Sequence, residues 1–148
     1  MRFYLVVLFG LFQIVSLPNT YAESAKFDLT DYQGQVVYVD FWASWCGPCR
    51  ASFPFMNQMH QRYGDKGLRV IGINVDNDKA DADVFLKAIP AQFAILYDAD
   101  GALAREFGVA GMPNSFLFDR EGKLIETHVG FRKDDPPQIE AMIKQALQ

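Results

Sequence analysis

The chain has 148 residues, and half of them are hydrophobic, which excludes a disordered protein and predicts a domain with a substantial core. Its 14 basic and 18 acidic residues give a formal net charge of −4 without any basic run, so nucleic acid is not expected as a partner. The length is typical of a single domain.

The first segment has the pattern of a secretory signal peptide. Arg2 supplies a positive charge, residues 3–17 are almost wholly apolar, and small or modest side chains precede Glu23. We therefore expect cleavage after Ala22, a signal peptide over residues 1–22 and a domain over residues 23–148. The alternative is an uncleaved membrane anchor, although a spanning helix needs about 20 apolar residues. Either case predicts a periplasmic or otherwise extracytoplasmic protein, and cleavage would leave it soluble.

Alternating strand and helix patterns follow this segment. Apolar runs rich in β-branched and aromatic residues predict strands at 35–42, 68–75, 93–97, 114–118 and 123–129. Helical spacing predicts helices at 49–63, 78–88, 102–107 and 136–147. Val84, Phe85 and Ala88 are expected to form the apolar face of the second helix, and Asp135 is expected to be the N-cap of the last. This order predicts an α/β fold with a mixed sheet between helices.

The two cysteines of the chain form one Cys46-Gly47-Pro48-Cys49 motif. A disulfide that encloses two residues constrains little of the unfolded chain, so a purely structural role is a poor explanation. The motif lies between a strand and a helix, which places Cys46 at a helix N-terminus, where a thiolate is stabilised. We predict that Cys46 attacks a partner's disulfide and that Cys49, more buried and one turn later, resolves the mixed disulfide.

A metal site is not expected, because there is no second cysteine pair. The two histidines, His60 and His128, lack ligand-like spacing. We expect His60 on an exposed helix face and His128 on the outward face of a terminal strand. No cofactor is predicted.

Residues 39–50 closely resemble the active-site segment of the thioredoxin superfamily. Gly111-Met112-Pro113 resembles the loop whose cis-proline faces the cysteines in that family, and Val129-Gly130 resembles the edge of its substrate groove. Residues 76–109 resemble the strand–helix insertion of the exported TlpA/ResA-like branch. The resemblance covers about residues 27–147 and implies a thioredoxin-like fold with that insertion.

The resemblance also implies roles for individual residues. Pro113 is implied as part of the catalytic site, although an ordinary turn proline is the alternative. The implied substrate-binding residues are Trp45, Gly47, Pro48, Met112 and Gly130. Trp45 is expected to lie over the disulfide, and the backbone of Met112 to pair with an extended substrate segment.

Asp40 matches the buried acid of thioredoxin, but Gly72 stands where thioredoxin has a neighbouring lysine. Without that cation, desolvation should raise the pKa of Asp40, which suits a proton acceptor for Cys49. The alternative is a tolerated polar residue at a strand end.

The predicted function is reduction of protein disulfides by dithiol–disulfide exchange, with oxidised protein thiols as substrates and a membrane-embedded electron donor. By resemblance, cytochrome c maturation and general cysteine repair are plausible pathways, and the chain is expected to act as a monomer. Three alternatives remain: a disulfide oxidase of the same fold, a thiol peroxidase, and a copper carrier that uses Cys46, Cys49 and His128. The peroxidase is disfavoured because Val39 and Ala43 replace the residues that activate peroxide.

Overall fold

A computed structural model describes residues 26–148 of the chain. The predicted signal peptide, residues 1–22, lies outside the described residues. None of the helices within residues 26–148 is long and apolar enough to cross a membrane.

The described residues form a five-stranded sheet with helices on both faces. The strands are β1 (Val36–Trp42), β2 (Leu68–Asn74), β3 (Ala94–Tyr97), β4 (Asn114–Phe118) and β5 (Leu124–Val129). The α-helices are α1 (Gly47–Tyr63), α2 (Lys79–Ala88), α3 (Ala102–Glu106) and α4 (Pro136–Ala146). Two 3₁₀ turns, Leu29–Tyr32 and Gly64–Lys66, precede β1 and β2. Every predicted element is present within a few residues of its expected bounds.

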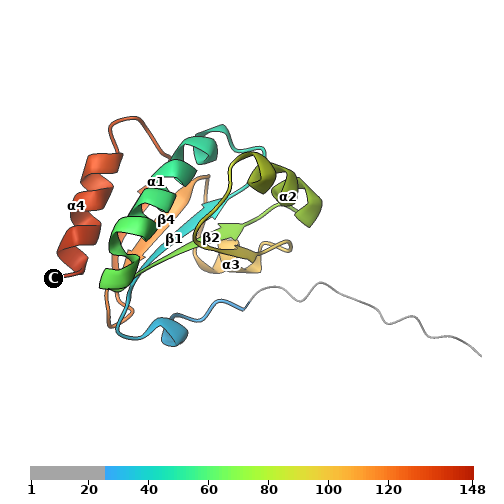
Figure 1. The fold of residues 1–148 in the computed structure, drawn as a ribbon. Coiled ribbons are helices and arrows are strands. Elements are labelled where there is room, and N and C mark those ends of the chain that lie inside the picture. Colours follow the sequence, from blue (N-terminus) through green and yellow to red (C-terminus); the bar gives the residue numbers. More distant parts are fainter. Residues whose placement is uncertain (1–25) are drawn as a thin grey trace, which may run out of the picture.

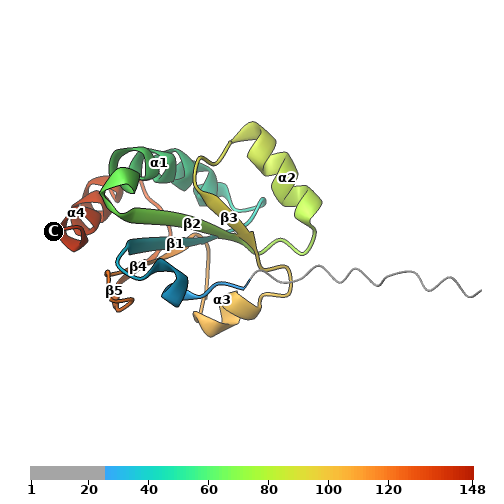
Figure 2. The same cartoon turned by 60° about the horizontal axis from the view of Figure 1, so that its bottom comes forward.

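The sheet has the order β3-β2-β1-β4-β5, which makes it mixed. β1 pairs in parallel with β2, and β2 with β3, whereas β4 lies antiparallel to both β1 and β5. Helices α1, α2 and α4 cover one face, and α3 covers the other together with the first 3₁₀ turn (Figures 1 and 2). The predicted thioredoxin-like architecture is confirmed, and residues 76–109 supply α2, β3 and α3.

β1 is buried along its whole length because helices cover both of its faces. Side chains alternate across the sheet. Tyr38 and Trp42 therefore join the core beneath α1 and α4, while Val39 and Phe41 join the core on the α3 side. This burial explains the continuous apolar run in the sequence.

The predicted apolar face of α2 is right at Phe85 and wrong at Val84 and Ala88. Val84 is 67% exposed and Ala88 is also exposed, whereas Ala82 and Phe85 are buried. The stripe that faces the sheet begins at Ala82 and continues at helical spacing through Phe85 to Ile89, which packs against the core. The predicted apolar face was therefore rotated about the helix axis relative to the face that is buried.

One β-bulge interrupts the β4–β5 hairpin. Leu117 pairs with Glu126 and Phe118 with Leu124, so Ile125 is the extra residue. At the end of the sheet where β1 and β2 begin, the Arg120 guanidinium donates hydrogen bonds to the carbonyl oxygens of Gly34 (2.7 Å), Lys66 (3.4 Å) and Leu147 (3.2 Å). This side chain therefore connects three distant segments of the chain.

Candidate active site

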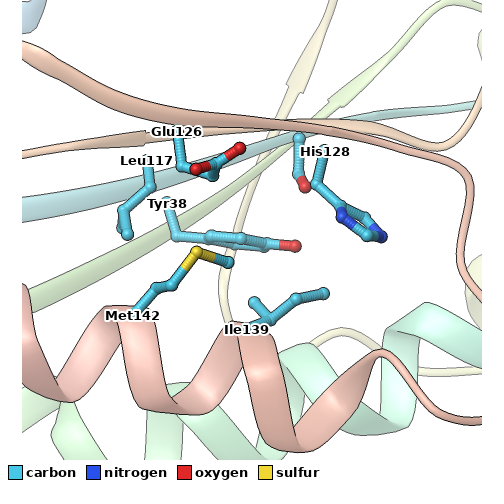
Figure 3. Close-up of a pocket in the computed structure, with 7 residues that line it drawn as sticks. Tyr38, Leu117, Glu126, His128, Ile139 and Met142 are labelled. Carbon is cyan, nitrogen blue, oxygen red and sulfur yellow. The ribbon is translucent and has the colours of Figure 1, made fainter.

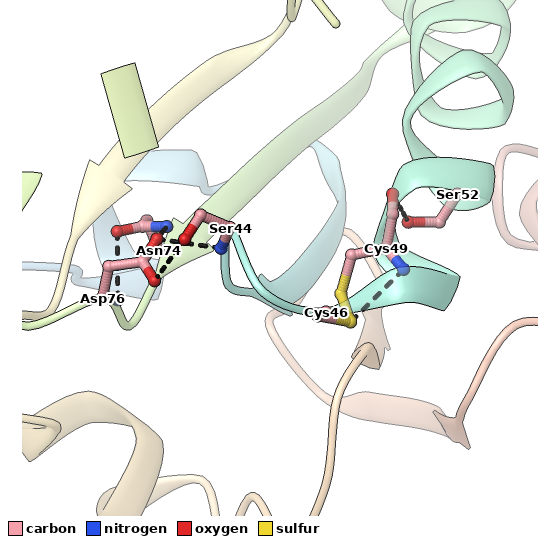
Figure 4. Close-up of a disulfide and its surroundings, with 6 residues drawn as sticks. All are labelled: Ser44, Cys46, Cys49, Ser52, Asn74 and Asp76. Carbon is pink, nitrogen blue, oxygen red and sulfur yellow. Dashed lines mark hydrogen bonds between the residues drawn. A yellow bond between two sulfur atoms is a disulfide. The ribbon is translucent and has the colours of Figure 1, made fainter. Parts of the chain in front are cut away.

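The two cysteines lie where β1 leads into α1, at the C-terminal end of β1. Cys46 is the N-cap residue of α1, and it forms a disulfide with Cys49 in the first helical turn. The Cys49 backbone N–H donates to Cys46 Sγ at 3.3 Å (Figure 4). A helix N-terminus places unpaired N–H groups and a positive partial charge at this sulfur. The arrangement favours a thiolate on Cys46 once the bond is reduced.

The surroundings of the disulfide are asymmetric. Cys49 is fully buried, while Cys46 retains 4% exposure. Three neighbours in the motif segment, Trp45, Gly47 and Pro48, are exposed, with Trp45 at 70%. The more accessible sulfur therefore lies among exposed groups, and the less accessible one lies beneath it, as the sequence predicts.

The loop before Cys46 is held by a buried carboxylate that the sequence analysis missed. Asp76 accepts hydrogen bonds from the Ser44 backbone N–H and the Ser44 hydroxyl, both at 2.9 Å, and from the Asn74 amide at 2.7 Å (Figure 4). Asp76 follows β2, which is the parallel neighbour of β1. The carboxylate thus fixes the loop that leads into the cysteine pair to the adjacent strand.

Asp40 lies on the face of β1 that α1 covers and is 2% exposed. Among residues 26–148, its Oδ2 atom finds no hydrogen-bond partner. Burial raises the pKa of Asp40 to about 8, and a hydrogen bond with Ser52 opposes part of that rise. Ser52 also donates to the Cys49 carbonyl oxygen at 3.1 Å, so it contacts both the acid and the backbone of the buried cysteine.

The absence of a cation beside Asp40 has a steric basis. Gly72 is the parallel partner of Asp40 in β2. A Cβ atom on Gly72 would lie 3.0 Å from side-chain atoms of Ile95 and Phe93 and 3.1 Å from Trp42 Nε1. A side chain at this position would therefore require Ile95, Phe93 or Trp42 to shift.

The loop before β4 contains a cis peptide bond between Met112 and Pro113, as the resemblance implied. The Gly130 N–H donates to the Pro113 carbonyl oxygen at 2.8 Å, which joins this loop to the end of β5. Met112 is half-buried and packs against the core cluster that contains both cysteines. The structure thus brings the proline loop, Gly130 and the cysteine side of the core together.

The predicted orientation of His128 is wrong. Its Nε2 atom lies 3.0 Å from Asp135 Oδ2 at the start of α4, and its side chain is only 22% exposed. The bulge at Ile125 is the cause, because one extra residue reverses which side chains of β5 face α4. Asp135 precedes α4 as predicted, but its carboxylate accepts from His128 and the Arg132 N–H rather than capping the helix. His60 is half-buried rather than exposed.

Residues 11–143 match the Redoxin family. The chain belongs to this family. It is 32% identical over 131 residues to the thiol–disulfide oxidoreductase ResA of Bacillus thuringiensis subsp. konkukian. This match covers 86% of this chain and 75% of that protein.

Two solved structures agree with this assignment. One, described as a thiol:disulfide interchange protein DsbE from Chlorobium tepidum, has a TM-score of 0.79 and 52% identity, covering 81% of this chain and 85% of that one. The exposed lipoprotein thioredoxin Etrx1 of Streptococcus pneumoniae has a TM-score of 0.68 and 33% identity, covering 79% and 89%. With the bonded Cys46–Cys49 pair, these similarities identify the Redoxin chain as a thiol–disulfide oxidoreductase of the TlpA/ResA-like type.

The geometry favours neither the thiol peroxidase nor the copper carrier. Val39 and Ala43 are fully buried apolar side chains without polar groups that could activate a peroxide. Within residues 26–148, the structure places no three histidine, cysteine or acidic side chains as a cluster that could hold a metal ion. His128, the third ligand of the copper hypothesis, is engaged with Asp135.

Proposed function

We propose that this Redoxin chain reduces disulfide bonds of exported proteins by dithiol–disulfide exchange at Cys46 and Cys49. The observation that carries the proposal is the position of Cys46 Sγ at the N-terminus of α1, where it accepts the Cys49 N–H. The predicted signal peptide and the likeness to an exposed lipoprotein thioredoxin support action outside the cytoplasm.

The reductive cycle follows from this geometry. The Cys46 thiolate attacks one sulfur of a substrate disulfide, forms a mixed disulfide and releases the first substrate thiolate. Cys49 then loses its proton, for which Asp40 is the proposed acceptor. The Cys49 thiolate attacks Cys46 Sγ, which forms the Cys46–Cys49 bond and releases the second substrate thiolate. Both substrate thiolates take protons from solvent, and two electrons have passed from the enzyme to the substrate.

We assign substrate contacts to the exposed groups around Cys46 and to the proline loop. Trp45, Gly47 and Pro48 form an exposed surface beside the attacking sulfur. Pro113 has no N–H, so its loop presents no competing donor to the sulfurs. Within residues 26–148 the Met112 backbone has no backbone hydrogen bond outside the helices and strands, so we assign it to pair with an extended segment, and Gly130 borders the same loop. The substrates implied by the resemblance include the oxidised Cys-x-x-Cys-His segments of c-type cytochromes.

The reducing direction requires a donor that restores both thiols, and we assign this role to a membrane-embedded dithiol protein. The direction is tested by equilibrating the protein with glutathione. A potential near the value of about −270 mV typical of thioredoxin supports reduction, whereas one near about −120 mV would make the protein an oxidase.

The order of attack is tested by trapping. Cys49→Ser should leave Cys46 in a stable mixed disulfide with an oxidised Cys-x-x-Cys-His peptide, because the resolving thiol is missing. Cys46→Ser is the matched control and should trap little. Stronger trapping by Cys46→Ser would reverse the two roles, and no trapping by either variant would reject this substrate.

A further inference from the structure

Three polar side chains form a row across the sheet. Asp40 of β1 is the antiparallel partner of Ser115 in β4, and Ser115 is the partner of His128 in β5. Directly opposed residues of antiparallel strands point to the same face, with Cβ atoms about 4.5–5.5 Å apart. The row therefore leads from the buried acid on the central strand to the edge strand.

Polar side chains are unusual at positions as deeply buried as those of Asp40 and Ser115. Asp40 is 2% exposed and Ser115 is 3% exposed, whereas the His128 side chain, at 22%, reaches solvent. Buried polar groups are costly unless they are paired, so core positions are normally apolar. Exposure thus increases along the row from Asp40 to His128.

A second hydroxyl and a small cavity lie beside the row. The Tyr38 side chain lies near Ser115. Figure 3 shows the Tyr38 ring between the sheet and α4, with its hydroxyl directed toward the end of the pocket where His128 lies. Tyr38, Ser115 and His128 line a cavity of about 10 Å³, which is close to the volume that one water molecule needs.

The chemistry of Asp40 requires such a route. Burial raises the pKa of Asp40 to about 8, so near neutral pH the acid carries a proton that must leave before it can accept the one from Cys49. The carboxyl group is buried, and its Oδ2 atom has no hydrogen-bond partner in the described part of the chain. Proton movement from a group without solvent contact depends on neighbouring hydroxyl or imidazole groups, or on a water between them.

We propose that Ser115 and His128 conduct the proton between Asp40 and solvent, with Tyr38 and the adjacent cavity completing the path. This inference rests on the proposed role of Asp40 in disulfide reduction. The Asp40 carboxyl group gives its proton to the Ser115 oxygen, and Ser115 passes its own hydroxyl proton onward through the cavity. His128 takes up one proton from the cavity side and releases one to solvent. No electrons move and no other bond changes.

The groups around His128 suit a proton exchanger at the surface. Asp135, the residue before α4, contacts Nε2, while Ser115 and Tyr38 lie on the cavity side, and Glu126 of β5 lines the same cavity. The other residues that line it are apolar side chains: Leu117, Ile139 and Met142. The path is therefore bordered by an apolar wall.

The experiment follows the reduced full-length protein through a single turnover with a disulfide-bonded peptide, in which release of the second peptide thiol reports the resolving step. His128→Gln and Ser115→Ala should each slow this step by about tenfold near neutral pH, below the range of about 10²–10⁴ for loss of a general base, because Asp40 remains. Formation of the mixed disulfide should keep its rate. In His128→Gln, increasing imidazole buffer should restore the resolving step.

Two matched controls separate this effect from a general loss of structure. His60→Gln removes the other histidine, and Thr127→Val removes an exposed hydroxyl next to His128 in the sequence. Neither should change the resolving step or its dependence on buffer. Ser115→Ala is small and keeps the β4 backbone, so it tests the path even if His128→Gln disturbs the start of α4.

Normal resolving rates without buffer dependence in both His128→Gln and Ser115→Ala would overturn the proposal. In that case the wild-type protein would still reduce the peptide, and the proposed function would stand. If the wild-type protein failed to reduce any peptide disulfide, the proposed function itself would fail. A slow first step in either variant would also overturn the proposal, because it would indicate damage to the cysteine site.

Discussion

The buried acid Asp40 should make the stability of the oxidised protein fall as the pH rises. Its pKa is raised from 3.8 to about 8 by burial, so between these values the native state holds a proton that the unfolded chain releases. Unfolding therefore becomes easier with increasing pH, and the effect ends above the native pKa. From about pH 5 to about pH 8, this difference amounts to roughly 3–4 kcal/mol of unfolding free energy.

Asp40→Asn isolates this contribution, because asparagine does not titrate and has nearly the same shape. Urea unfolding of both oxidised proteins, followed by tryptophan fluorescence across this pH range, gives the two free-energy curves. The difference between them should change by roughly 3–4 kcal/mol, with the wild type losing stability as pH rises. Ser52→Ala should extend the loss to higher pH, because the Ser52 hydrogen bond lowers the pKa of Asp40. Parallel curves for wild type and Asp40→Asn would refute a raised pKa.

Three further substitutions test the packing around the site, each by its urea midpoint at constant slope. Asp76→Ala should cost about 2–3 kcal/mol, because it leaves the Ser44 N–H and two other donors without a partner. Gly72→Ala should cost about 1–3 kcal/mol, because its Cβ would lie 3.0 Å from core side-chain atoms. Arg120→Ala should cost about 1–2 kcal/mol by removing three hydrogen bonds to carbonyl oxygens, and lysine should recover only part of it. An unchanged midpoint would count against the corresponding contact.

The sequence was sufficient to predict the elements and the cysteine chemistry, because both depend on local patterns. The apolar run of β1 and the Cys46-Gly47-Pro48-Cys49 motif are continuous in the chain. Each can therefore be interpreted without knowing which distant residues it contacts. The Val84 error shows the limit of a short periodic pattern. Apolar residues at neighbouring positions define a helix, but the side that faces the sheet is decided by packing.

The rest of the site depends on pairing between distant strands. Ser44 and Asp76 are 32 residues apart, and they meet because β1 and β2 are parallel neighbours. Asp40 and Ser115 meet through the antiparallel register of β4. Register is set by the whole sheet and by irregularities such as the bulge, so no local pattern identified these contacts.

The extra residue in β5 determines how the hairpin responds to insertions and deletions. If the two strands paired regularly from the Phe118–Leu124 pair onward, Thr127 would lie opposite Ser115. The extra residue Ile125 shifts the pairing by one residue, so His128 lies opposite Ser115 instead. A one-residue deletion at Ile125 can therefore straighten the strand and leave every later pair unchanged. The same deletion between Glu126 and His128 would turn the imidazole to the opposite side of the sheet. Two sequences of equal length, differing only in where one residue is lost, would thus have different chemistry at the same edge.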